Sequence, residues 1–197
     1  LVDDVSFFET GVAIDVVSGT ADITGLGLEN VSVGLGSDSG ASTTVSSIYG
    51  QHVALLIDGT YADDLTVSNA LVSGDRLLWG SVESIALSDM NFTQENPGRS
   101  TIDIRCSVDC TFDNLYVHNA DIGIDVDGAG TTTFTDSEIY ANQLGLRASG
   151  TGLLVMESSL LKANQTALSI SSVNTELSNT TLSLHDGIGP AAILLEG

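Results

Sequence analysis

The feature that most constrains the fold is an internal repeat, in which inward apolar residues return in three columns along the whole chain. The first column reads Val2, Ile23, Val45, Ala62, Val82, Phe112, Phe134, Val155 and Leu177. The second reads Phe7, Leu28, Ile48, Val67, Leu87, Val117, Ile139, Leu160 and Leu182. The third reads Ile14, Leu35, Leu55, Trp79, Ile104, Ile124, Leu146, Leu168 and Ile193, at steps of 20 to 25 residues. Nine members in each column predict nine repeats.

Each repeat holds three short alternating segments separated by Gly, Asn, Asp or Ser, which indicates three strands joined by turns. A helical heptad cannot produce so long a period. No repeat can bury its own apolar face, whereas repeats stacked at about 4.8 Å form parallel sheets around a continuous core. We therefore expect one all-β domain over residues 1–197, a parallel solenoid of about nine coils.

A column of turn residues supports this register. It comprises Glu9, Asn30, Gly50, Asn69, Asp89, Asn119 and Ala141, with Asn142 and Asn164 displaced by a residue or two. Asn, Asp and Gly tolerate the left-handed backbone of a tight corner, so we interpret the column as structural.

The segments TFTDSEIYANQLGLRASG and TFDNLYVHNADIGIDVDG resemble the Asn-x-x-Gly-Ile coil consensus of the right-handed parallel β-helix family, which includes the pectin-lyase-like proteins. The resemblance implies a right-handed, single-stranded β-helix, and it is our basis for the handedness. It is specific to a fold and not to an activity.

The charge balance excludes one class of partner. The chain has 26 acidic and 5 basic residues, a formal net charge of −21, so it cannot neutralise the phosphates of a nucleic acid. No apolar run approaches the roughly 18 residues of a membrane span. So acidic a surface would suit a saline environment.

Two features favour an extracellular or cell-surface location. Four Asn-x-Ser/Thr sequons predict glycosylation at Asn30, Asn91, Asn164 and Asn179. Cys106 and Cys110 can form a disulfide if a turn brings their α-carbons within about 7 Å, the alternatives being free thiols or a metal site. A metal is least favoured, because the three histidines, His52, His118 and His185, lie in separate repeats.

Polysaccharide-cleaving members of the resembled family carry either a calcium-binding acidic cluster with an arginine base or several aspartates near a Gly-His-Gly turn, and neither motif occurs here. The nearest approach is Asp103 and Arg105 on one outward face, with Asp125 and Arg147 on the next two coils. We favour an ion-pair ladder for these four residues over an acid/base site, and we predict no catalytic residue.

Acidic turns raise the question of calcium. They are DVDG at 125–128, SDSG at 37–40 and ADD at 62–64. Their oxygen atoms could serve as ligands, but none has the spacing of a known calcium loop. We therefore predict ordinary turn residues, no metal site and no cofactor, with Ca²⁺ as the alternative.

Two apparent insertions, at 69–76 and 88–101, leave the same corner of adjacent coils and predict a raised binding patch. Its residues are Asp75, Arg76, Asp89, Asn91, Gln94, Glu95, Asn96 and Arg99. The alternative is a pair of tolerated insertions, shielded by a glycan on Asn91. Phe8, Tyr49 and Tyr140 are predicted to point outward near one edge, where stacked aromatic rings could bind sugars or a partner subunit.

Neither end reads as a capping segment, since Val2 and the final AAILLEG continue the ladders. We therefore expect a non-catalytic structural or adhesive solenoid, stacked end to end on copies of itself or on neighbouring coils. The alternative is a carbohydrate-active or carbohydrate-binding β-helix, with glycans as partners.

Overall fold

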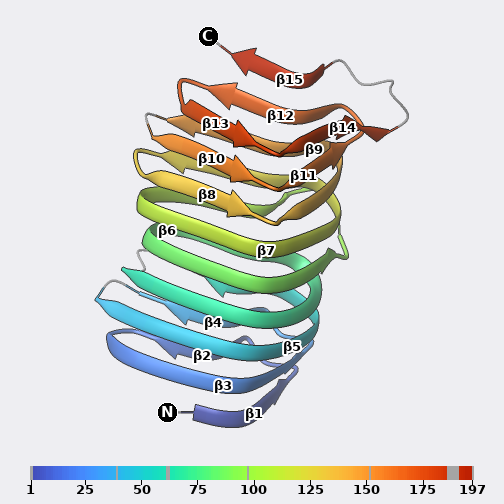
Figure 1. The fold of residues 1–197 in the computed structure, drawn as a ribbon. Coiled ribbons are helices and arrows are strands. Elements are labelled where there is room, and N and C mark those ends of the chain that lie inside the picture. The colour runs from blue at the N-terminus through green and yellow to red at the C-terminus, as the bar shows by residue number, and fades with distance from the viewer. Residues whose placement is uncertain are drawn as a thin grey trace.

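The chain winds into a parallel β-solenoid, in which each turn lies on the one before it (Figure 1). The computed structural model describes residues 2–38, 40–60, 63–96, 98–150, 152–185 and 191–196. Its strands are β1 (Val2–Phe8), β2 (Val12–Val16), β3 (Gly19–Glu29), β4 (Val33–Ser37), β5 (Ala41–Asp58), β6 (Asp64–Gln94), β7 (Ser100–Gly128), β8 (Thr131–Thr135), β9 (Glu138–Gly150), β10 (Leu153–Glu157), β11 (Leu160–Ala163), β12 (Thr166–Ser171), β13 (Asn174–Ser178), β14 (Thr181–Leu184) and β15 (Ala191–Glu196). The all-β, parallel architecture predicted from the repeat is confirmed. No helix in the described ranges is long and apolar enough to cross a membrane.

One corner of every turn is built by a residue with left-handed backbone. These residues, with φ between 47° and 71°, are Asp4, Gly25, Ser47, Asn69, Asp89, Asn114, Asp136, Ser158 and Asn179. Their short polar side chains, or the lack of one in glycine, make this conformation accessible. Nine such corners are separated by eight full turns, in agreement with about nine coils.

The turn column inferred from the sequence combined two different corners. Asn69 and Asp89 belong to the corner just described, whereas Glu9, Asn30 and Asn119 form a second one together with His52, all with φ between 49° and 58°. Two corners that use the same residue types cannot be told apart by spacing alone.

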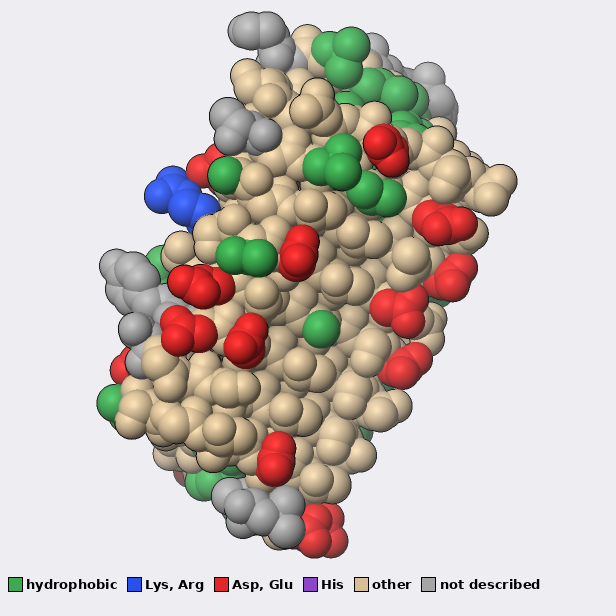
Figure 2. All heavy atoms as spheres, turned by 60° about the vertical axis from the view of Figure 1, so that its left-hand side comes forward, with side chains coloured by type: hydrophobic (Ala, Val, Ile, Leu, Met, Phe, Trp, Pro, Cys, Tyr) green, Lys and Arg blue, Asp and Glu red, His purple; other side chains and the backbone are tan. Residues whose placement is uncertain are grey.

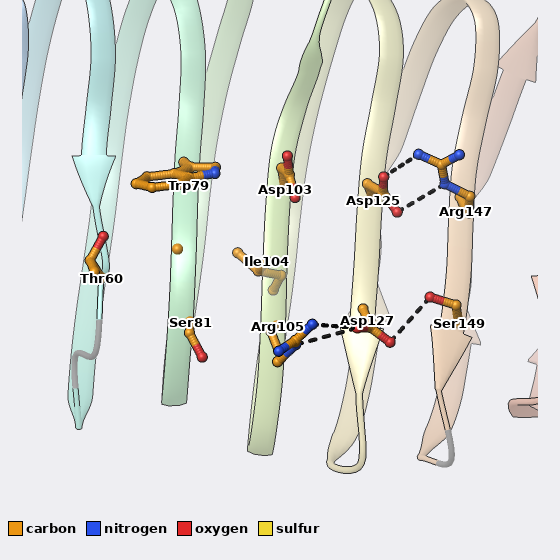
Figure 3. Close-up of a pocket in the computed structure, with 11 residues that line it drawn as sticks. Thr60, Trp79, Ser81, Asp103, Ile104, Arg105, Asp125, Asp127, Arg147 and Ser149 are labelled. Carbon is orange, nitrogen blue, oxygen red and sulfur yellow. Dashed lines mark hydrogen bonds and ion pairs between the residues drawn. The ribbon is translucent and has the colours of Figure 1, made fainter.

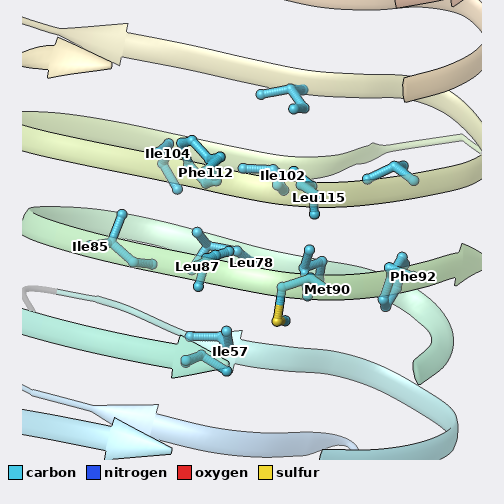
Figure 4. Packing of buried hydrophobic residues seen from close by; sticks show 14 of the residues in the cluster. Ile57, Leu78, Ile85, Leu87, Met90, Phe92, Ile102, Ile104, Phe112 and Leu115 are labelled. Carbon is cyan, nitrogen blue, oxygen red and sulfur yellow. The ribbon is translucent and has the colours of Figure 1, made fainter. Parts of the chain in front are cut away.

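The core consists of apolar ladders that run along the solenoid axis. Ile23, Val45 and Val67 pair in register, and Phe112 pairs with Phe134 on the next coil. The Phe112 and Phe134 rings are fully buried and stack with centroids 4.6 Å apart. Figure 4 shows such residues from successive coils packed inside the ribbon. Burying side chains of this size stabilises each rung by about 1.5–3 kcal/mol per residue.

Several predicted column positions are wrong by one or more residues. Val67 and Leu87 stand in the first ladder rather than the second, and Met156 and Leu161 point inward where Val155 and Leu160 were expected. Ala62, also assigned to the first column, lies outside the described residues. A slip of one residue moves a side chain to the opposite face of a strand, so periodicity alone locates a strand better than its phase.

The most consequential slip concerns Trp79. The third column placed it inside, but the fully buried Leu78 occupies that position between Ile57 and Ile102. The Trp79 side chain points outward and is 42% exposed.

The two predicted insertions also differ in the structure. Residues 69–76 and 88–94 are regular parts of β6, and only residues 95–99 separate β6 from β7. Residues 69–76 looked inserted because Val67, which stands in the first ladder, was taken as the second-column residue, so the second strand itself was counted as a loop. The extra residues at 95–99 account for the 25-residue step from Asp89 to Asn114, the longest between successive corners.

Candidate functional site

All four arginines of the chain line hollows that share one exposed indole. Arg76, Arg99, Arg105 and Arg147 line two neighbouring hollows, and Trp79 lines both. We call this outward side of the solenoid the arginine face. The remaining basic residue, Lys162, is on β11, a different strand of the coil. On the face drawn in Figure 2, acidic side chains are scattered over a largely uncharged surface and basic atoms appear at one edge.

The first hollow, which we call the ion-pair groove, has a volume of about 560 Å³. Its side chains stand in two rows across successive coils (Figure 3). One row contains Trp79, Asp103, Asp125 and Arg147, and the other contains Thr60, Ser81, Arg105, Asp127 and Ser149. The rows arise because residues two apart in a strand point to the same side, and because each strand is aligned in register with the strand of the next coil.

Charged side chains in the ion-pair groove are paired across coils. The Arg147 guanidinium forms an ion pair with Asp125, in which Nε donates to Oδ1 over 3.0 Å. Arg105 Nε and Nη2 donate to Asp127 Oδ2 at 3.3 and 3.2 Å, and the Ser149 hydroxyl donates to Asp127 Oδ1 at 3.2 Å. The contacts therefore form a ladder of ion pairs between neighbouring strands.

The structure brings together the four residues that the sequence placed on one face, Asp103, Arg105, Asp125 and Arg147. Sequence reasoning missed Asp127, although it lies two residues after Asp125 and so on the same side of the strand. It also missed Trp79, because that residue had been assigned to the core.

The groove offers fixed charge pairs beside a flat aromatic surface. Each of its aspartates lies at ion-pair distance from a guanidinium group. The arrangement is suited to donating and accepting hydrogen bonds with a bound polar molecule, while the indole offers an apolar platform.

The second hollow, which we call the Arg76 pocket, measures about 860 Å³. It is lined by Ala54, Leu55, Asp75, Arg76, Trp79, Asn96, Gly98 and Arg99. The Arg76 side chain is only 17% exposed, and its nearest carboxylate oxygen, Oδ2 of Asp103, is 3.8 Å away. Its Nε is buried and has no hydrogen-bond partner within the described part of the chain.

Four of the eight residues in the predicted binding patch line this pocket, namely Asp75, Arg76, Asn96 and Arg99. The structure does not bring Asp89 and Asn91 to the pocket. Asp89 lies at a corner and accepts a hydrogen bond from Asn114 at 2.7 Å. Asn91 on β6 lies opposite Tyr116 on β7, the strand of the next coil.

Gln94, another member of the predicted patch, is fully buried and holds the loop 95–99 in place. Its Nε2 donates to the carbonyl oxygens of Asp75 and Arg99 at 2.8 and 3.3 Å. Its Oε1 accepts from the Asp121 amide at 3.1 Å and from the Thr101 hydroxyl at 3.4 Å. Gln94 therefore positions the pocket wall instead of facing a ligand.

Glu95, the last member of the patch, forms a charged contact with a histidine. Its Oε2 lies 2.9 Å from Nδ1 of His52, and the Ser73 hydroxyl donates to Oε1 over 2.6 Å. The hydrogen bond to Glu95 and its charge raise the pKa of His52. Partial burial acts to raise the pKa of Glu95, but the bonds from Ser73 and His52 outweigh it and lower the pKa below its usual value.

Comparison with known protein families settles the fold. A family model described as "Right handed beta helix region" matches residues 32–192, a span that includes both hollows. The chain belongs to the right-handed beta helix family. No curated protein and no solved structure matches the chain. Membership in the right-handed beta helix family establishes the architecture, and the function has to be argued from the arginine face itself.

The outward aromatic residues of this beta helix do not form one stack. Phe8 and Tyr49 are 65% and 54% exposed and stand in different register columns, opposite Glu29 and Gly27 respectively. Tyr140 lies parallel to the His118 ring at 5.1 Å, with the Lys162 amine 6.0 Å away. The neighbours of Tyr140 therefore partly cover its ring.

The other predicted sites of the beta helix have the following surroundings. The asparagines of all four sequons are exposed, and their glycosylation remains a prediction. Cys106 and Cys110 are joined by a disulfide, with α-carbons 6.2 Å apart. The described residues contain no group of three or more His, Cys, Asp or Glu side chains that could hold a metal ion.

The acidic turns considered for calcium make bonds within the protein. The carboxylates of DVDG pair with Arg147 and Arg105, and Asp63 Oδ2 accepts a hydrogen bond from the Gly40 amide at 3.0 Å. Ser39 and Ala62, in the other two turns, lie outside the described residues.

Proposed function

We propose that this right-handed beta helix is a non-catalytic extracellular or cell-surface adhesive protein that binds a glycan over Trp79 and the ion-pair groove. The observation that carries the proposal is the exposed indole of Trp79, beside two rows of polar and charged side chains that repeat from coil to coil. The exposed sequons and the disulfide support an extracellular location.

A glycan matches the chemistry of this surface. The apolar side of a sugar ring packs on an indole, while its hydroxyls exchange hydrogen bonds with carboxylates, guanidinium groups and hydroxyls. Strands about 4.8 Å apart present equivalent side chains at regular intervals, which suits a ligand that is itself a repeating chain. Groups held on paired strands lose little conformational entropy when they bind.

The experiment uses Trp79 itself, because it is the single tryptophan of the chain. Titration with xylotriose, cellotetraose and maltotetraose is expected to change the intrinsic tryptophan fluorescence saturably for at least one of them. Calorimetry should then show that binding is lost in Trp79→Ala but retained in Tyr49→Ala, a control for removing another exposed ring. Absence of saturable binding to every glycan, acidic or neutral, would contradict the proposal.

The catalytic alternative makes a different prediction for the same groove. If Asp103, Arg105, Asp125 and Arg147 formed an acid/base site, incubation with a glycan would release shorter or unsaturated products. The variants Arg105→Gln and Arg147→Gln would then abolish product formation. Under our proposal no product appears, and the two variants change only affinity and local charge pairing.

A second candidate function is end-to-end association with copies of the chain. It is favoured by exposed apolar side chains on β13 and β15, namely Leu177, Ile193, Leu194 and Leu195, of which Leu195 is 73% exposed. In the described structure β15 pairs with β12 alone. Because a net charge of −21 opposes association, salt should promote it. Light scattering at low and high salt would detect such assemblies, and Leu195→Asp should abolish them. Assembly unchanged in this variant would contradict stacking through β15.

A further inference from the structure

Arg76 differs from the other arginines of the arginine face in how its donors are used. Arg105 and Arg147 each hydrogen bond to an aspartate on a neighbouring coil. Arg76 has only the Asp103 carboxylate, at 3.8 Å, and its buried Nε has no partner. A charged group that is largely removed from water with few hydrogen bonds is costly. A guanidinium whose one carboxylate partner is 3.8 Å away and whose Nε makes no hydrogen bond therefore favours a further anion that can accept hydrogen bonds.

The surroundings of Arg76 suit an anion as well. Arg99 is exposed on the wall of the Arg76 pocket, and no carboxylate within the described ranges lies at ion-pair distance from it. Among the described residues that line the pocket, Asp75 is the one that is acidic, and its Oδ1 already accepts a hydrogen bond from Asn96 at 2.6 Å. The pocket lining therefore holds two guanidinium groups and one engaged carboxylate, and the Asp103 carboxylate, 3.8 Å from Arg76, is a second acidic neighbour.

We infer that the Arg76 pocket binds one anionic group, a carboxylate or a sulfate ester, carried by the glycan that packs on Trp79. Trp79 and Leu55 supply apolar contacts beside Arg76, and Trp79 continues into the ion-pair groove. The inference rests on the proposed function for the identity of the carrier, but the anion site itself depends only on the pocket. A single anionic group fits better than a dense polyanion, which the acidic remainder of the molecule would repel within the Debye length of about 8 Å at physiological salt.

The first test measures the anion site without a glycan. Sodium glucuronate and sodium sulfate are titrated at constant ionic strength against sodium chloride, with Trp79 fluorescence as the readout. Glucuronate supplies a carboxylate and sulfate supplies the sulfate chemistry, so the two titrations distinguish the possible ligand groups. We expect saturable binding of at least one of them to the wild-type protein.

The matched variants are Arg76→Gln and Lys162→Gln, which remove the same charge from different strands of the coil. A charge-assisted hydrogen bond contributes about 1.5–3 kcal/mol, so Arg76→Gln should weaken anion binding by about tenfold or more. Lys162→Gln should leave the affinity unchanged. Arg76→Lys keeps the charge and should fall between wild type and Arg76→Gln, because an ammonium cannot reproduce the planar donor pair. Equal affinity in wild type and Arg76→Gln, or no saturable binding to wild type, would overturn the inference.

The second test separates this inference from the proposed function. It compares xylotriose with xylotriose that carries one glucuronic acid branch. The acidic sugar should bind the wild type about tenfold more tightly, and Arg76→Gln should remove that preference. Equal binding of both sugars to wild type would overturn the anion pocket and leave the glycan-binding proposal standing. If neither sugar binds while glucuronate alone still binds through Arg76, the anion pocket stands and the glycan-binding proposal fails.

Discussion

Replacing Gln94 with leucine tests whether the wall of the Arg76 pocket is held by a buried polar side chain. Leucine has nearly the same volume but makes none of the four hydrogen bonds of the glutamine. The two shortest of these, to the Asp75 carbonyl at 2.8 Å and from the Asp121 amide at 3.1 Å, leave partly buried backbone groups without a partner when they are lost. Each such group costs about 1–3 kcal/mol, and the two longer bonds add little, so we expect a destabilisation of about 3 kcal/mol.

The assay is urea unfolding followed by the fluorescence of Trp79, which borders the same pocket. The matched control is Gln165→Leu, since Gln165 is exposed and a surface change of this kind should stay within about 0.5 kcal/mol of wild type. Gln94→Leu should also weaken glucuronate binding, because Arg99 loses the bond that holds its carbonyl oxygen. A loss of stability below about 1 kcal/mol for Gln94→Leu would refute the reasoning, because it would mean that the freed backbone groups are not left unpaired.

Two further predictions concern coil packing and pH. A Cβ on Gly74 would lie 1.9 Å from the Val53 carbonyl oxygen, so Gly74→Ala should separate these coils and lower the unfolding midpoint markedly. The control is Gly11→Ala, which has open space around it and should leave the midpoint unchanged. Equal midpoints for the two variants would contradict the stacking. In an NMR titration the pKa of His52 should lie above the ordinary value for histidine, because the ring is bonded to Glu95, and the pKa of His118 below it, because that ring is partly buried. The His52 contribution to stability is thus present at low pH and is lost as pH rises through its raised pKa, while His118 disfavours folding as pH falls. Glu95→Gln should return only the His52 pKa towards the ordinary value, and a shift of both histidines would refute the assignment.

The parts of the fold that could be predicted are those that depend on repetition. Three apolar segments per repeat and turn residues between them require stacking, because no single repeat can bury its own apolar side chains. The errors in the predicted columns arose where the sequence allows either of two alternations of inward and outward side chains along a strand. Leu77, Leu78 and Trp79 are three successive apolar residues, and periodicity does not say which of them points outward.

The candidate site could be predicted only in part, for the same reason. Asp103, Arg105, Asp125 and Arg147 were placed on one face because each lies in a strand whose alternation is unambiguous. Gln94 looked like a surface residue of an inserted loop, yet it is buried because backbone groups from two coils need its amide as a partner.

The sequence by itself determined that this chain is a parallel solenoid of the right-handed beta helix family, since the repeat and its corner residues are local features. Only the tertiary structure decided that Arg76 is largely buried with an Nε that has no hydrogen-bond partner among the described residues, and that Asn96 and Arg99 line the same pocket. The pocket joins Arg76 and Trp79 of one coil to residues about 20 positions further along the chain, and its geometry depends on strand phase and on which donors find partners. Neither the strand phase nor the pairing of donors can be inferred from the spacing of residue types along the chain.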